Sequence, residues 1–205
     1  MNEERFKNLW GRCPIDTRVA SPVAAYAELA RHYGEPWRRY HTGEHLDACL
    51  RHFDSARQHM EEPDAVEMAL WYHDAVYDVR GNDNEERSAQ LFKETVEGAA
   101  DEGFCDRVCD LIMVTQHMDP PEQGDARYIV DIDLSSFGQP WDAFIADSRK
   151  VRAEITHLSD AEFNESQSKF LRKLQSRPSF FTSEYFRDRY EARARVNLDR
   201  LLIGL

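Results

Sequence analysis

The chain has 205 residues, of which 41% are hydrophobic and 31% are charged. This length and balance are typical of one ordinary globular domain, and they exclude a disordered chain, a collagen-like repeat and a small disulfide scaffold. Lys and Arg number 26 against 38 Asp and Glu, which gives a formal net charge of −12. Duplex phosphates repel such a surface, so we expect no nucleic acid as the main partner.

No stretch of the sequence is apolar for long enough to cross a bilayer, and the first ten residues carry acids where a signal peptide carries bases. We therefore expect a cytoplasmic protein with no membrane partner. The four cysteines (Cys13, Cys49, Cys105 and Cys109) contain no CxxC pair. We expect them to be reduced, buried thiols and not ligands of a zinc–thiolate site.

Helix-start and helix-stop residues occur along the whole chain. Ser21-Pro22 and Gly34 bound one predicted helix, Thr42 can cap a second, and Pro63 can begin a third that runs through His73 as far as Val76 or Tyr77. Apolar residues at three- and four-residue spacing predict further helices. One of these helices begins after Asp83-Asn84, the next runs from Phe104 to Thr115, and another from Trp141 to Ile155. A further helix opens at the capping box Ser159–Glu162, and the last runs from about Ser183 to Leu202.

The segment from Tyr128 to Leu134 fits two patterns. Its β-branched residues alternate as in a strand, but a single strand would have no partner in this chain, so we predict the start of a buried helix. The sequence as a whole therefore predicts an all-α fold and a single domain over residues 1–205. Residues from about 20 to 140 would form its core, and helices from about 141 to 203 would follow.

Seven of the eight histidines lie before residue 120. Among them, the pair His73-Asp74 is the strongest indication of a functional site. His45 stands 28 residues earlier on a predicted helix. Asp131 and Asp133 stand about 60 residues later in an apolar setting, where an unpaired carboxylate would be costly. Two imidazoles and two carboxylates converging from three helices would suit a divalent ion, with Mn, Fe, Co, Ni, Zn and Mg as candidates. A buried histidine bonded to a nearby carboxylate is the structural alternative.

The order H…HD…D resembles that of the HD superfamily of metal-dependent phosphohydrolases. The blocks RYHTGEHL, ALWYHDAVYD, NDNEERSA, VTQH and DIDLSSFG are similar to those of one bacterial group of predicted members. The resemblance covers roughly residues 20–200. It implies an HD-domain-like helical bundle that hydrolyses a phosphate ester of a small metabolite, such as a nucleotide. The implied metal ligands are His45, His73, Asp74 and either Asp133 or Asp131, with a weak preference for Asp133.

Further roles follow from the resemblance and from position along the chain. Asp74 would handle the proton of the attacking water, and Glu85 or Glu86 would orient that water or protonate the leaving group. His41 is either an alternative first ligand or a substrate contact, because it lies four residues before His45. The other candidate phosphate contacts are Arg38, Arg39, Arg87 and His117. Acids at a helix start and a histidine at a helix end also stabilise helices without any catalytic role.

Two other functions fit parts of the sequence. His41 to His45 spells HxxEH, the inverted zinc-peptidase motif, with Glu44 as the base. Gly43 weakens that helix, and the motif leaves His73-Asp74 unexplained. A regulatory protein that binds a nucleotide or metal without turnover would use the same ligands as the hydrolase. The hydrophobic stripes could pack internally or across a homodimer.

Overall fold

The computed structural model describes residues 1–204, and the elements of this part of the chain are all helices. The prediction of an all-α single domain is confirmed. The α-helices are α1 (Glu3–Trp10), α2 (Pro22–Tyr33), α3 (Gly43–Ala56), α4 (Pro63–Tyr72), α5 (Asn84–Thr95), α6 (Glu102–Met113), α7 (Ala126–Asp133), α8 (Trp141–Glu154), α9 (Asp160–Gln175) and α10 (Glu184–Gly204). Short 3₁₀ helices form η1 (Arg57–His59), η2 (Val114–Gln116) and η3 (Leu134–Gly138).

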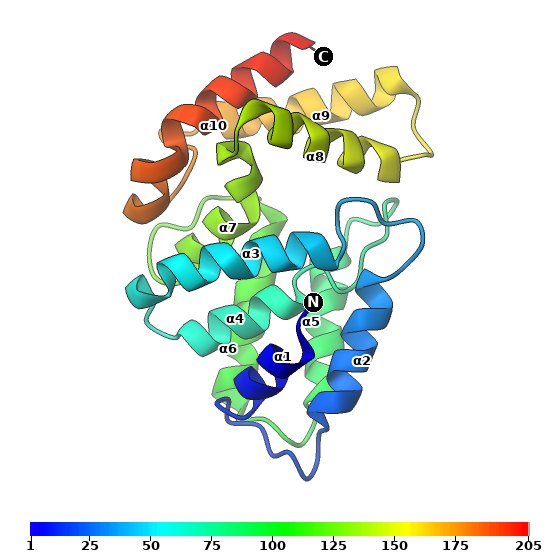
Figure 1. The fold of residues 1–205 in the computed structure, drawn as a ribbon, viewed down its shortest axis with the longest axis vertical. Coiled ribbons are helices and arrows are strands. Elements are labelled where there is room, and N and C mark those ends of the chain that lie inside the picture. Colours follow the sequence, from blue (N-terminus) through cyan, green and yellow to red (C-terminus); the bar gives the residue numbers. More distant parts are fainter. Residues whose placement is uncertain (205) are drawn as a thin grey trace.

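The helices are arranged in two parts (Figure 1). Helices α1 to α6 form the larger, lower part, and α8, α9 and α10 lie together above it. Helix α7 and η3 connect the two parts; α7 contacts α3, and η3 contacts α8 and α10. Apart from Phe163, the buried hydrophobic residues of both parts belong to one continuous core.

Most of the predicted helix starts occur where the capping residues indicated them. Ser21 and Thr42 accept backbone N–H groups at the starts of α2 and α3, and Ser159 and Glu162 form the capping box of α9. The segment around residue 130 is helix α7, as predicted. Helix α1 was not predicted; it begins at the cap Asn2 and buries Phe6, Leu9 and Trp10.

Helix α4 lies at the centre of the lower part. It contacts α1, α3, α5 and α6, and all of its residues from Ala65 to Tyr72 are buried, because this segment is almost entirely apolar. The predicted extension to Val76 or Tyr77 is wrong, since α4 ends at Tyr72 with His73 as its C-cap. Arg38 donates to the carbonyls of Asp74 and Ala75, which a continuing helix would have used internally.

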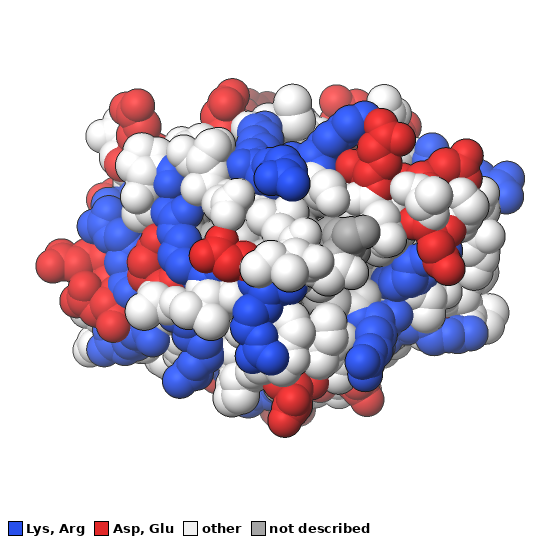
Figure 2. Space-filling view, turned by 90° about the horizontal axis from the view of Figure 1, so that it is seen from above, with Lys and Arg blue, Asp and Glu red and all other residues white. Residues whose placement is uncertain are grey.

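The negative charge is concentrated in one part of the chain. Residues 1–140 carry 14 Lys and Arg against 28 Asp and Glu, whereas residues 141–205 carry 12 against 10. Figure 2, seen from above onto the C-terminal helices, accordingly shows Lys and Arg at many points among the acids. No helix in the described part of the chain is long and apolar enough to span a bilayer.

Candidate metal centre

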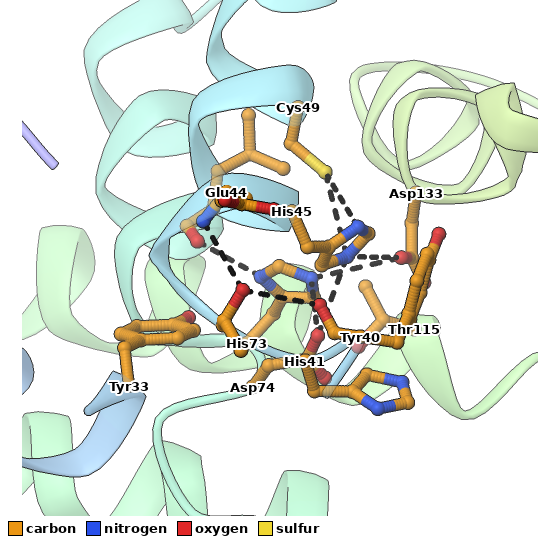
Figure 3. Close-up of polar contacts among 12 residues, drawn as sticks. Tyr33, Tyr40, His41, Glu44, His45, Cys49, His73, Asp74, Thr115 and Asp133 are labelled. Carbon is orange, nitrogen blue, oxygen red and sulfur yellow. Dashed lines mark hydrogen bonds and ion pairs between the residues drawn. The ribbon is translucent and has the colours of Figure 1, made fainter. Parts of the chain in front are cut away.

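Two histidines and two aspartates from three helices meet at one point (Figure 3). His45 lies in the first turn of α3, His73 and Asp74 follow α4, and Asp133 ends α7. His45 Nε2 is 3.4 Å from Asp74 Oδ2 and 3.3 Å from Asp133 Oδ1; His73 Nε2 is 3.2 Å and 3.6 Å from the same two oxygens. Adjacent ligands held at roughly 2.0–2.2 Å from one ion are separated by about 3.0–3.5 Å. We call these four residues the HD group.

The two histidines of the HD group are buried and its two aspartates are partly buried, and part of the group's hydrogen-bonding capacity has no partner. His73 is 1% exposed, and neither its Nε2 nor Asp74 Oδ2 has a hydrogen-bond partner in the described part of the chain. Buried polar atoms without a partner are rare in folded proteins. With neutral imidazoles the two carboxylates give this group a charge of −2, which a divalent cation would neutralise. The donor set and its burial therefore fit a divalent metal ion.

Neighbouring groups fix how two members of the HD group point. His73 Nδ1 donates to the carbonyl of Leu70 at 2.8 Å, which leaves the lone pair of Nε2 directed toward the group. His117 Nε2 donates to Asp133 Oδ2 at 2.8 Å, while the other oxygen of Asp133 faces His45 and His73. His117 has φ +55°, a left-handed conformation that costs a residue with a Cβ about 1–2 kcal/mol. This strained position allows His117 to orient Asp133.

The buried electrostatics follow from this arrangement. Burial lowers the pKa of His73, but the carboxylates of Asp74 and Asp133 outweigh it and raise the pKa well above the usual range. Burial raises the pKa of Asp133, but the hydrogen bond from His117 and the nearby imidazoles of His45 and His73 lower it well below the usual range. A cation at this point would therefore compete with protons for the same atoms.

Cys49 is a neighbour of the HD group that the sequence did not nominate. Its buried Sγ lies 3.6 Å from Nε2 and 3.9 Å from Nδ1 of His45, and within 4.8 Å of ligand atoms of His73 and Asp133. Because Sγ is almost equidistant from the two ring nitrogens, it lies beside the ring and not in front of the Nε2 lone pair. An ion about 2.1 Å from Nε2 would be about 4 Å from Sγ, far beyond a metal–sulfur bond of about 2.3 Å. Asp74, and not Cys49, completes the donor set.

A cavity of about 240 Å³ opens beside the HD group, and Asp74 and Asp133 form part of its lining. Glu85, in the first turn of α5, lines it too. Burial raises the pKa of Glu85, and the negative charges of Asp74 and Asp133 raise it further. The cavity thus has room for a ligand in contact with both the HD group and this carboxyl.

His41 lines the same cavity and is held by a buried glutamate. Glu154, the last residue of α8, has a fully buried side chain. Its Oε2 accepts from His41 Nδ1 at 2.7 Å, and its Oε1 accepts the backbone N–H groups of Arg39, Tyr40 and His41 at 2.6, 2.8 and 3.0 Å. The ring of Tyr77 packs against the His41 imidazole, with ring centroids 4.1 Å apart. Nδ1 of His41 is thus engaged, and only Nε2 remains to bind a ligand.

Asp131 does not belong to the HD group, which corrects one of the two alternatives. Residues two apart on a helix point in nearly opposite directions, so Asp131 faces away from Asp133. Its fully buried carboxylate accepts the backbone N–H groups of Thr182 and Ser183 at 2.8 and 2.7 Å, and also the Thr182 hydroxyl. Asp131 therefore connects α7 to the start of α10.

Four more candidates lie away from the cavity. The guanidinium of Arg38 is buried and donates to the carbonyls of His41, Asp74 and Ala75, so it supports the backbone below the HD group. Arg39 donates to carbonyls of its own loop, Arg87 lies near Asp83 on the surface, and Glu86 is exposed. None of the four lines the cavity, so the structure does not bring these candidates together with the HD group.

The HxxEH arrangement is not assembled as a zinc-peptidase site. His41 precedes α3, as the predicted cap at Thr42 indicated, and its ring pairs with Glu154. The side chain of Glu44 is 85% exposed, and it is therefore not placed to act as a base beside His45.

A scan against models of protein families, a search of curated protein sequences and a search of solved structures each found no match. The fold and the site by themselves define an all-helical protein with a buried group of imidazoles and carboxylates. That group could hold a metal ion.

Proposed function

We propose that this protein is a metal-dependent phosphohydrolase of the HD type, acting on a phosphate ester of a small metabolite. The proposal is carried by one observation, the convergence of His45, His73, Asp74 and Asp133 at the edge of a cavity. The same four residues are those that the resemblance to the HD superfamily nominates. The unpartnered atoms of His73 and Asp74 support a cation at this point.

The residues around the cavity can be assigned roles in hydrolysis. A divalent ion held by the HD group would neutralise charge on the phosphoryl oxygens and lower the pKa of a water. Asp74 takes the proton of the attacking water, whose oxygen forms a bond to phosphorus as the ester P–O bond breaks. Glu85 gives a proton to the leaving alcohol oxygen, and its raised pKa favours the protonated form that this requires. His41, oriented by Glu154, donates from Nε2 to a phosphoryl oxygen.

The test is phosphate release from a panel of phosphate esters by the full-length protein with Mn, Co, Ni, Zn or Mg. Asp74→Asn removes the proton acceptor and a metal ligand, and should abolish turnover. Glu85→Gln should lower kcat by roughly 10²–10⁴-fold while the bound metal is retained. Asp188→Asn, an exposed change on α10, is the matched control and should leave turnover unchanged.

Two results would contradict the proposal. Turnover that persists in Asp74→Asn would place the reaction elsewhere. The second result is that no ester of the panel is hydrolysed, although the wild type binds metal stoichiometrically and His73→Ala does not bind it. This would favour a regulatory protein that binds its ligand without turnover.

A further inference from the structure

The cavity beside the HD group has no Lys or Arg in its lining. The acidic residues of its lining are Asp74, Glu85, Asp133 and Asp147. Lys150 lies 3.2 Å from Asp147 and lines a neighbouring pocket together with Arg51. Within this lining, only an ion held by the HD group would supply full positive charge to a phosphoryl group.

Helices α8 and α9 provide a different kind of wall. Phe144, Asp147, Ser148 and Val151 recur at three- and four-residue spacing, and so they occupy one face of α8. Phe137 of η3 lies against Phe144, with ring centroids 5.1 Å apart.

Helix α9 adds a ring and an amide to this wall. Phe170 lies 6.5 Å, between ring centroids, from His117, which itself holds Asp133. Gln167 stands one turn before Phe170 and lines the same cavity. The aromatic wall therefore lies close to the HD group, separated from Asp133 only by the ring of His117.

These two features select among phosphorylated molecules. A second phosphate would lie beside acidic residues and would meet no Lys or Arg of the lining, so like charges would repel it. An aromatic ring would instead bury its faces against phenylalanines. The amide of Gln167 and the hydroxyl of Ser148 can accept or donate hydrogen bonds at the edge of such a ring.

On the basis of the proposed function, we propose that the substrate is a phosphomonoester whose alcohol carries an uncharged aromatic ring. The ring packs against the wall formed by Phe137, Phe144 and Phe170, and molecules with a second phosphate are rejected. Aryl phosphates and nucleoside monophosphates share this chemistry, and the experiment distinguishes them.

The first experiment compares kcat/KM values of the Mn-loaded, full-length protein. Phenyl phosphate should exceed glycerol phosphate by about tenfold or more. AMP should exceed ADP by about 100-fold or more, since each added charge faces the acids of the cavity. A higher kcat/KM for AMP than for phenyl phosphate would identify nucleoside monophosphates as the substrate class. A higher kcat/KM for phenyl phosphate would identify simple aryl esters. Equal or better turnover of ADP, or of glycerol phosphate, would overturn the inference.

Two variants test the wall directly. Phe170→Ala should lower the ratio of the phenyl phosphate to the glycerol phosphate kcat/KM by about tenfold. Phe163→Ala, which removes a ring of α9 that does not line the cavity, should leave the ratio as it is. Ser148→Lys puts a cation on the wall and should raise turnover of ADP relative to AMP by about tenfold, whereas the exposed Ser166→Lys should not.

A binding measurement separates this inference from the proposed function. Calorimetric titration of the Mn-loaded protein with phenyl phosphate, glycerol phosphate and pyrophosphate needs no turnover. One outcome is that none of the three compounds is hydrolysed, yet phenyl phosphate binds about tenfold more tightly than the other two. The proposed hydrolysis would then be wrong, and the proposed ligand class would be supported. If pyrophosphate binds as tightly as phenyl phosphate, the ligand class fails whether or not hydrolysis occurs.

Discussion

Replacing Glu154 with alanine tests whether one buried carboxylate joins the C-terminal helices to the loop before α3. The side chain accepts three backbone N–H groups and the ring of His41, all from residues at least 113 positions away in sequence. Removing it deletes these hydrogen bonds and leaves a row of backbone donors without their acceptor. Both the packing of α8 and the orientation of His41 depend on this contact.

The magnitude follows from the ionisation of Glu154. Burial raises its pKa, but His41 and the backbone donors lower it, from 4.5 to about 2 overall. A shift of this size corresponds to about 3 kcal/mol of stability at neutral pH. Glu154→Ala should therefore destabilise the protein by about 3–4 kcal/mol, once the unsatisfied backbone donors are included. For a chain of this length the melting temperature should fall by about 10 °C.

The sign of the pH dependence is fixed by the lowered pKa. The contribution of Glu154 is complete above pH 4.5 and is lost as the pH falls toward 2. Glu154→Gln keeps an acceptor for the backbone but no charge. The stability difference between the wild type and this variant should shrink over that range.

Urea unfolding followed by circular dichroism at 222 nm measures these differences. Glu165→Ala on α9 is the matched control, because that glutamate is 70% exposed and pairs only with Lys169; it should cost about 0.5 kcal/mol or less. If Glu154→Ala lay within about 1 kcal/mol of the wild type, or if its cost did not change between pH 7 and pH 3, the account of Glu154 would be refuted.

Further outcomes concern the HD group and its surroundings. A divalent ion at 100 times its Kd should stabilise the wild type by about 2.7 kcal/mol, and His73→Ala should abolish both this gain and the bound metal; retained metal would contradict the site. His117→Ala should weaken metal affinity by about 10–100-fold in chelator competition, since Asp133 loses its orienting partner; an unchanged Kd would reduce His117 to a packing role. Asp131→Ala should cost about 3 kcal/mol in urea unfolding but leave the metal content unchanged, and loss of metal would restore Asp131 as a ligand.

Much of the fold could be predicted because helix boundaries are local features. Ser21, Thr42 and Ser159 cap the helices that follow them, and apolar spacing marks the buried faces. The end of α4 could not be predicted, because Arg38 binds the carbonyls of Asp74 and Ala75 from 36 and 37 residues away. Helix α1 carried a usable signal, namely the 3,4 spacing of its buried residues after Asn2.

The candidate site could be predicted only in part. The sequence gives the type and spacing of its residues, but the direction in which each side chain points depends on how the helices pack. His45, His73 and Asp74 were nominated from type and spacing, whereas the choice between Asp131 and Asp133 required the orientation of α7. Arg38 was a reasonable phosphate contact by position, but its guanidinium is used for backbone carbonyls. No local pattern indicates that Glu154 contacts His41 across 113 residues.

The HD group and the aromatic wall come from separate stretches of the chain. Every member of the group lies between residues 45 and 133, whereas the wall comes from η3, α8 and α9. Substitutions along α8 and α9 can therefore alter which molecule is accepted without touching an atom that would hold the ion. A library of variants confined to this wall, screened for both retained metal and altered substrate preference, could exchange the specificity of the protein while its reaction is preserved.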